Sequence, residues 1–209
     1  MIKEPDKISF KSGLYLIVCP QITSNCIEIV RKGIKGGVKI VQLRAKEMPD
    51  NKVLALAKQI RIITKKNQVQ FVINDRLDIA LAVEADGVHL GQDDLPIKEA
   101  KQLLKDKIIG ISVHSLKEAV RAEKQGADYI GLGPIFQTKT KVSKALGIKI
   151  ITQIKKEIKI PIVAIGGINK DNAQEVLAAG ASCVAVVSTI CGAKDIAKAA
   201  KELATISKK

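Results

Sequence analysis

The feature that most constrains the fold is an alternation of short apolar runs with longer segments of helical periodicity, repeated eight times along the chain. The apolar runs are expected to be strands, at 14–20, 38–44, 69–75, 87–90, 107–113, 127–133, 161–167 and 182–188. Helical spacing of apolar residues follows each of them, at 22–36, 50–66, 77–84, 95–104, 115–125, 147–158, 170–179 and 194–206. Consecutive strands begin roughly 25 residues apart.

Most of these runs are apolar at every position, which is typical of strands buried on both faces in a parallel sheet. Eight strand–helix units predict the α/β class and, within it, a single (β/α)8 TIM barrel over residues 1–209. Residues 1 to about 13 are expected to form an N-terminal extension before the first strand. A doubly wound open sheet is the alternative, and the number of units favours the barrel.

The formal charge of +14, from 35 basic and 21 acidic residues, raises the question of nucleic-acid binding. The lysines are spread over nearly every expected helix, and aromatic residues make up only 2% of the chain, which leaves no obvious stacking platform for bases. We therefore expect no nucleic-acid partner, and keep a basic nucleic-acid-binding protein as a distant alternative.

Neither the apolar runs nor the cysteines indicate a membrane or an oxidising compartment. No apolar run reaches the roughly 18 residues that span a bilayer, so we expect no membrane partner. The first residues lack the apolar core of a signal peptide, which predicts a cytoplasmic protein. The four cysteines show no C-x-x-C spacing and are expected to be reduced.

In a barrel of this kind the active site lies where the strands lead into the helices, so those turns can be considered together. Gln42 and Arg44 lie on one side of the strand at 38–44, and Lys46 follows just beyond. A guanidinium beside an ammonium suits a phosphate or diphosphate. The alternative is a salt bridge at the rim.

Carboxylates and amides follow the next two strands. Asn74 and Asp75 end one of them, and Gln92, Asp93 and Asp94 follow the other. Oxygen ligands of this kind at the ends of neighbouring strands can hold Mg²⁺. The alternatives are N-capping of the following helix by Asp93 or Asp94, and a simple ion pair between Asp75 and its neighbour Arg76.

The later turns add hydroxyls and glycines. Ser112 and His114 share a strand face, Ser115 begins a capping box with Glu118, and a lone histidine is more often structural than catalytic. The glycine pair 166–167 and the end of the strand at 182–188 suit a phosphate, because backbone amides there can approach an anion.

The turn after the strand at 127–133 is unusually long, and carries Thr138, Lys139, Thr140 and Lys141. Long polar turns usually carry function, although a solvated lysine loop is the alternative. The loop lies between the two expected anion sites in chain order, which suits two phosphorylated substrates or one bisphosphate. We expect it to act as a lid.

These motifs together resemble the thiamine phosphate synthase family. The matching segments span nearly the whole chain from Leu14, in order and at compatible spacing, and lie at 42–46, 74–75, 91–94, 110–112, 131–136, 138–141, 165–168 and 187–188. The family departs from this sequence at Gln137, where it usually has proline, and we expect a more flexible loop there without loss of activity.

The resemblance implies a reaction and assigns residues to it. 4-Amino-2-methyl-5-(diphosphooxymethyl)pyrimidine would join 4-methyl-5-(2-phosphooxyethyl)thiazole, or its carboxylated form, to give thiamine phosphate and diphosphate. The pyrimidine diphosphate would be bound by Gln42, Leu43, Arg44, Ala45, Lys46, Asn74, Ser112 and Lys141. The thiazole phosphate would be bound by Thr138, Lys139, Thr140, Gly167, Val187 and Ser188.

The resemblance also implies one Mg²⁺ per subunit, bound by Asp75 and Asp94, and a dissociative mechanism in which diphosphate leaves first. Arg44, Ser112 and Lys141 would be the catalytic residues, acting by charge and position, with no protein nucleophile or general base. The alternative is a thiazole tautomerase of the same fold, in which a histidine in the place of His114 would act. Association into a homo-oligomer is left open.

Overall fold

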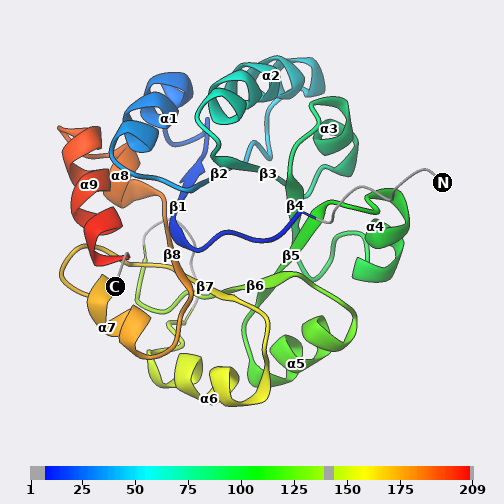
Figure 1. The fold of residues 1–209 in the computed structure, drawn as a ribbon, viewed down its shortest axis with the longest axis vertical. Coiled ribbons are helices and arrows are strands. Elements are labelled where there is room, and N and C mark those ends of the chain that lie inside the picture. Colours follow the sequence, from blue (N-terminus) through cyan, green and yellow to red (C-terminus); the bar gives the residue numbers. More distant parts are fainter. Residues whose placement is uncertain (1–7, 139–143, 208–209) are drawn as a thin grey trace.

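The computed structural model describes residues 8–138 and 144–207, and its eight strands form one closed parallel barrel (Figure 1). The strands pair in chain order, and the first also pairs with the last. They are β1 (Gly13–Val18), β2 (Ile40–Leu43), β3 (Gln70–Asn74), β4 (Gly87–Leu90), β5 (Ile108–Val113), β6 (Tyr129–Leu132), β7 (Ile162–Ile165) and β8 (Cys183–Val186). The predicted barrel is confirmed, and the open-sheet alternative is wrong.

Helices surround this barrel on the outside (Figure 1). They are α1 (Cys26–Lys35), α2 (Asp50–Lys66), α3 (Leu77–Ala82), α4 (Ile97–Leu103), α5 (Leu116–Lys124), α6 (Lys149–Glu157), α7 (Ala173–Ala178), α8 (Ser188–Cys191) and α9 (Ile196–Ile206). The single-turn α8 was not predicted, because four residues are too few to show a helical period. Helix α1 begins later than expected, since Ile22 and Thr23 donate to the Cys19 carbonyl in a turn.

The barrel has two separate apolar layers, which explains why its strands are apolar at nearly every position. Side chains alternate along each strand, so Leu14, Leu16 and Val18 pack under the helices, whereas Tyr15 and Ile17 point into the lumen. The outer layer joins all eight strands to the helices, and the inner layer fills the lumen.

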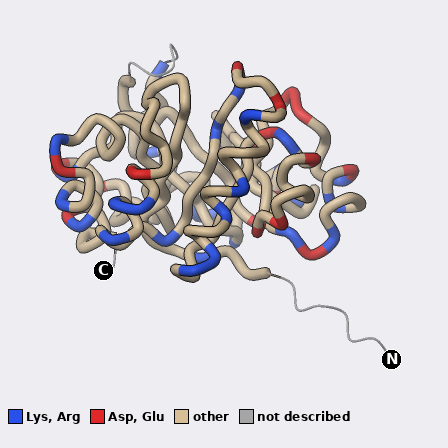
Figure 2. The backbone as a smooth tube through the Cα atoms, turned by 90° about the horizontal axis from the view of Figure 1, so that it is seen from above, with Lys and Arg blue, Asp and Glu red and all other residues tan. Residues whose placement is uncertain are grey.

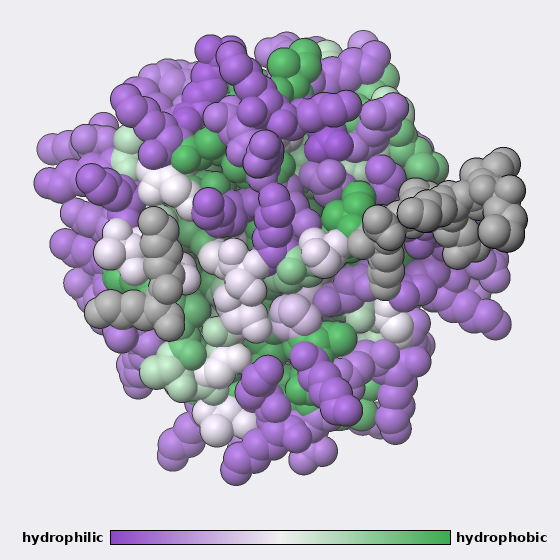
Figure 3. Space-filling view, viewed as in Figure 1, coloured by the Kyte–Doolittle hydropathy of each residue, from purple (hydrophilic) through white to green (hydrophobic). Residues whose placement is uncertain are grey.

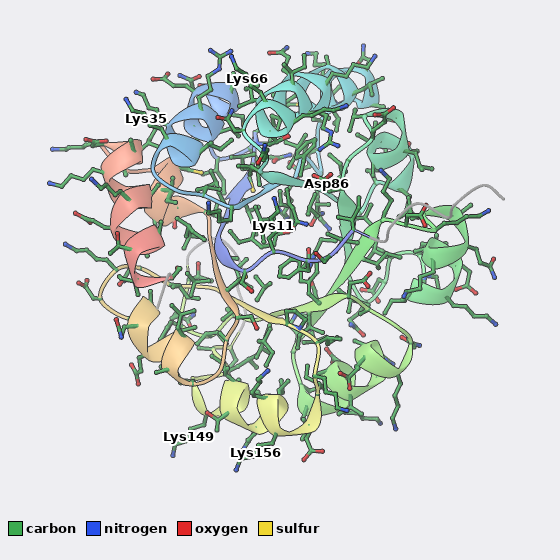
Figure 4. All side chains as sticks on the ribbon, in the orientation of Figure 1. Lys11, Lys35, Lys66, Asp86, Lys149 and Lys156 are labelled. Atoms are coloured by element: carbon green, nitrogen blue, oxygen red, sulfur yellow. The ribbon has the colours of Figure 1, made fainter. Side chains whose placement is uncertain are left out.

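The segment before β1 crosses the end of the barrel at which the strands begin (Figure 1). Lys11 in this segment lies over the centre of that face (Figure 4), and its backbone N–H donates to Gln70 Oε1 over 2.8 Å. Phe10 stacks on Tyr129 inside the lumen, with ring centroids 4.3 Å apart. The centre of this face carries less hydrophilic side chains than its rim (Figure 3). This end of the lumen is therefore filled by side chains.

Basic residues are distributed around the helices and interspersed with acidic ones (Figure 2). This agrees with the spread of lysines along the sequence, and the absence of a nucleic-acid partner stays a prediction. None of the helices in the described part of the chain combines the length and hydropathy that crossing a bilayer requires.

Gly110 on β5 makes room for the Tyr129 side chain in the lumen. Gly110 lies beside Tyr129 in the register of β5 and β6, and a Cβ at Gly110 would be 2.1 Å from Tyr129 Cζ. We expect Gly110→Ala to destabilise the protein by about 3 kcal/mol, because the fully buried Tyr129 ring can shift only by breaking the stacking and hydrogen bonds that hold it. Thermal unfolding should show Tm lower by roughly 6–12 °C.

Gly33→Ala is the matched control. Its Cβ would lie 2.9 Å from the end of the Leu16 side chain and 3.4 Å from Val38 Cγ2, with no backbone atom in the way, and alanine favours the helix that contains it. The change in free energy of unfolding should stay within about 1 kcal/mol. Equal Tm values for the two variants would contradict the steric argument.

Candidate active site

A cavity of about 450 Å³ opens at the ends of the strands that lead into the helices. Residues from all of the strands or the turns that follow them line it, as expected for this fold. Of the residues predicted from the sequence to form the site, those that line the cavity are Gln42, Arg44, Lys46, Asn74, Asp75, Asp94, Ser112, Thr138 and Val187. The turns that are far apart in the chain therefore meet at one place.

Other predicted residues lie near this cavity without lining it. The Leu43 side chain is 1% exposed and packs toward the helices, since it alternates with Gln42 and Arg44 along β2. Ala45 packs against the same outer layer, and Ser188 is the first residue of α8. Lys139, Thr140 and Lys141 lie outside the described residues. The binding roles of all of these stay predictions.

Asp75 occupies a strained position at the end of β3. Its φ is +62°, a region that non-glycine residues rarely adopt, and Arg76 N donates to the Asn74 carbonyl across it over 2.7 Å. The Asp75 N–H donates to the carbonyl of His89 on β4 over 2.9 Å. Backbone strain of this kind is concentrated at functional sites, and here it turns the carboxylate into the cavity.

Asp75 and Asp94 adjoin each other in the cavity wall. Burial raises the pKa of Asp75, and the hydrogen-bonding contact and negative charge of Asp94 raise it further, whereas Lys46 opposes the shift. Lys46 Nζ lies 2.9 Å from Asp75 Oδ2. Two adjoining carboxylates, of which only Asp75 has an ammonium partner among the described residues, form a site where additional positive charge would be stabilising.

The structural alternatives for these two aspartates are wrong. Asp94 Oδ2 accepts from Gly91 N over 2.6 Å, and α4 begins after Pro96 without a side-chain cap. Arg76 pairs with Asp50 and Asp78 instead of Asp75. The rim salt bridge proposed as an alternative does exist for Lys46, but it is made to a carboxylate that lines the cavity.

The donor set suits Mg²⁺ only if other ligands complete it. Within residues 8–138 and 144–207, no group of three or more His, Cys, Asp or Glu side chains is arranged to hold a metal. Mg²⁺ commonly binds through one or two carboxylates and fills its remaining positions with water and substrate phosphates. The adjoining pair Asp75 and Asp94 fits that pattern.

A chain of buried polar groups crosses the floor of the cavity. Gln42 Nε2 donates to Tyr15 Oη over 2.7 Å, and the Tyr15 and Tyr129 hydroxyls are 3.0 Å apart. His89 Nδ1 lies 2.9 Å from Tyr129 Oη, and His89 Nε2 lies 3.0 Å from Ser112 Oγ. These groups come from five different strands, so the closed barrel brings them together.

No role was predicted from the sequence for the three residues in the middle of this hydrogen-bonded chain, Tyr15, Tyr129 and His89. Burial lowers the pKa of His89 to about 4, so its ring is neutral at pH 7, and burial raises the pKa of both Tyr15 and Tyr129. One signal was available: an imidazole and two phenols inside otherwise apolar strands need hydrogen-bond partners, which the lumen of a barrel must supply.

His114 lies in the cavity wall, where Glu118 holds it. Glu118 Oε2 accepts from the His114 backbone N–H over 2.7 Å and lies 3.3 Å from His114 Nδ1. The Ser115 hydroxyl accepts from Glu118 N over 3.2 Å, which confirms the predicted helix cap. The Glu118 side chain, which would bond to Ser115 N in a full capping box, bonds to His114 instead.

The loop after β6 approaches the glycine pair closely. Phe136 N donates to Gly166 O over 3.0 Å, and a Cβ at Gly167 would lie 2.7 Å from Gln137 O. Gly167 has φ +66°, so glycine is favoured there on both counts. Of the pair, Gly166 lines the cavity, and Gly167 lets the loop carrying Thr138 reach it.

Comparisons with known proteins identify the family to which the chain belongs. A family model described as thiamine monophosphate synthase matches residues 14–190. The thiamine-phosphate synthase of Pyrococcus furiosus is 45% identical over 197 residues, which are 94% of this chain and 95% of that protein. The enzyme of the same name from Methanospirillum hungatei is 47% identical over 199 residues, 93% of this chain and 97% of that one.

A solved structure is similar throughout. Thiamine phosphate pyrophosphorylase from Pyrococcus furiosus superposes with a TM-score of 0.89 at 43% identity, covering 94% of this chain and 95% of its own. The family model covers well over half of the chain, and these relatives match along nearly their full lengths. The chain belongs to the thiamine monophosphate synthase family.

Proposed function

We propose that the protein is a thiamine phosphate synthase, an alkyl transferase that releases diphosphate. It would join 4-amino-2-methyl-5-(diphosphooxymethyl)pyrimidine to 4-methyl-5-(2-phosphooxyethyl)thiazole or its carboxylated form. The observation that carries this proposal is the meeting of Asp75, Asp94, Arg44 and Lys46 in one cavity, because a diphosphate and its metal need that combination of charges. The names of the full-length relatives support it.

The chain's own residues suit a dissociative reaction. The bond from the pyrimidine methylene carbon to the diphosphate oxygen breaks first, and its electron pair leaves with the diphosphate. The thiazole nitrogen then donates its lone pair to the methylene carbon. Arg44 and Lys46, with Lys141 from the segment outside the described residues, would stabilise the charge that grows on the leaving group.

Asp75 and Asp94 would hold Mg²⁺ beside that group. When bound, the ion would add positive charge to the departing diphosphate. The protein needs no nucleophile under this mechanism, and burial raises the pKa of Cys19, the thiol in the cavity wall. The two remaining tasks are to position the rings and to exclude water from the cation that forms.

The thiazole phosphate would bind on the other side of the cavity. Thr138, Gly166 and Val187 line that side, with Gly167 and Ser188 adjoining it. Lys139 and Thr140 would complete the phosphate contacts. A cavity of about 450 Å³ lies within the usual range for small-molecule sites, which is consistent with two modest substrates.

A two-substrate assay tests the proposal. Purified protein with both phosphorylated substrates and Mg²⁺ should form thiamine phosphate and release diphosphate in equal amounts. The pyrimidine alcohol, which lacks the leaving group, should give no product under the same conditions. If no diphosphate is released from the complete mixture, the proposed function is wrong.

Removal of divalent cations should lower turnover sharply. We expect EDTA to slow product formation at least about 100-fold, because metal charge contributes several kcal/mol to stabilising a departing phosphate. Excess Mg²⁺ should restore the rate. Circular dichroism before and after chelation serves as the control, and a rate unaffected by EDTA would remove Asp75 and Asp94 from their proposed role.

A further inference from the structure

The buried chain from Gln42 to Ser112 has a direction of hydrogen bonding, which follows from the number of protons that its members carry. Each phenol has one O–H, and the neutral imidazole has one N–H. Gln42 Nε2 already donates to Tyr15 Oη, so the single Tyr15 proton is free to donate onward to Tyr129. Tyr129 then donates to His89 Nδ1, and the ring proton lies on Nε2 and is donated to Ser112 Oγ.

The opposite direction is not compatible with the Gln42 carboxamide as it stands. Tyr15 would then accept from both Gln42 and Tyr129, and its own proton would have no described acceptor. The Tyr15 side chain is 1% exposed, and a buried donor without an acceptor is costly. Reversal would require the carboxamide and all the intervening protons to turn together.

The direction decides what the two ends present to the cavity. At one end, Ser112 accepts from His89, which leaves its own hydrogen free to donate to a ligand. At the other end, Gln42 Oε1 makes no hydrogen bond among the described residues. Among the described residues, Arg61 Nε is the one buried side-chain nitrogen or oxygen without a hydrogen-bond partner. Gln42 Oε1 also has no partner, so it is not fully buried and must border the cavity that Gln42 lines.

We propose that this chain makes the site selective for an aminopyrimidine over the corresponding oxopyrimidine, which deepens the proposed function and rests on it. An exocyclic amine can donate to Gln42 Oε1, and the ring nitrogen beside it can accept from the Ser112 hydroxyl. A 4-oxo ring presents the reverse pattern, a carbonyl acceptor beside an N–H donor. Its carbonyl would face the Gln42 Oε1 acceptor, and its ring N–H would face the Ser112 hydroxyl donor. Tyr15, Tyr129 and His89 are therefore positioning residues that set specificity.

The tautomer of His89 tests the direction without any substrate. The chain contains only two histidines, so a ¹⁵N spectrum of histidine-labelled protein at pH 7 is simple, and a His114→Gln sample assigns it. We expect His89 to carry its proton on Nε2. A proton on Nδ1 would mean that the hydrogen bonds run the other way, and would overturn the inference whatever the enzyme's activity.

Dissociation constants for the 4-amino and 4-oxo forms of the pyrimidine diphosphate test the selectivity. Wild-type protein should prefer the amino form by at least about 100-fold, because the oxo form leaves both ends mispaired. Tyr129→Phe and Tyr15→Phe each cut the chain and should lower that preference at least about tenfold, since the ends can then reorient separately. Phe10→Leu, which alters packing on the Tyr129 ring but keeps every hydroxyl, should retain it.

The outcomes separate this inference from the proposed function. An unchanged preference in both tyrosine variants, or an equal loss in Phe10→Leu, would overturn the role of the hydroxyls while leaving the reaction intact. Equal dissociation constants of the wild-type protein for the 4-amino and 4-oxo forms would also overturn the proposed selectivity and leave the reaction intact. Protein that binds neither ring would contradict the proposed function, and the His89 tautomer would still decide the direction of the chain. If a tyrosine variant fails to fold, as judged by circular dichroism, the other variant and the tautomer decide.

Discussion

Asp75→Asn is expected to lower kcat/KM by roughly 10²- to 10³-fold, one of the two largest effects that the structure predicts. The substitution keeps the shape of the side chain but removes one of the two adjoining carboxylates in the cavity. Mg²⁺ binding should weaken, so the concentration of Mg²⁺ that gives half-maximal rate should rise. Steady-state kinetics at several Mg²⁺ concentrations measure both effects.

The same variant should not lose stability. Asp75 and Asp94 repel each other, and half-burial disfavours the charge of Asp75, so an amide removes an unfavourable interaction. Asparagine also tolerates the positive φ at this position. We expect Tm equal to or above that of the wild type. A lower Tm, or an unchanged Mg²⁺ dependence, would assign Asp75 a structural role.

Asp78→Asn is the matched control for Asp75→Asn. Asp78 carries the same charge three residues further on, is exposed, and pairs with Arg76 outside the cavity. Its replacement should leave kcat and the Mg²⁺ dependence unchanged. A comparable loss in both variants would indicate a general effect of negative charge instead of a metal site.

Arg44→Ala is expected to lower kcat by roughly 10²- to 10³-fold with a smaller effect on KM. Arg44 lies beside the Cys19 thiol, and no carboxylate of the described residues forms an ion pair with it, so its charge is available to an anion. Its backbone N–H donates to Val18 O over 2.9 Å, which holds it at the rim. The charge matters most when diphosphate departs, so kcat should fall.

Arg44→Lys distinguishes charge from shape. Lysine keeps the charge but loses the planar fork that binds a phosphate through two hydrogen bonds, so activity should recover only in part. Arg31→Ala, at an exposed position on α1, controls for the loss of one positive charge. Kinetics in which Arg44→Ala raises KM and leaves kcat unchanged would place Arg44 in ground-state binding.

The strands and much of the site could be predicted from local patterns. Side chains along a strand point alternately to its two faces, which places Gln42 and Arg44 together on the cavity side of β2. The structure confirms this prediction. The same alternation places Leu43 on the opposite face, although the family motif that includes it runs through consecutive residues. Family motifs give positions in the chain, whereas the strand period says which side chains reach the cavity.

Two alternatives that rested on position in the chain were wrong for the site aspartates. Asp94 was a plausible helix cap by position, but it bonds back to Gly91 in the turn after β4. Asp75 was adjacent to Arg76 in the chain, but its partner is Lys46 from the turn after β2. For Asp75, a partner brought by the closure of the barrel replaced the neighbour in the sequence, whereas Asp94 bonds within its own turn.

The sequence by itself determined the number of strands, their parallel burial and which residues stand at their ends, because these depend on a side-chain period that is local to each segment. Only the tertiary structure decided that Tyr15, Tyr129 and His89 link Gln42 to Ser112. Those contacts cross the lumen between strands far apart in the chain, and their distances depend on how the strands tilt and close into a barrel. No pattern within a single strand specifies that closure.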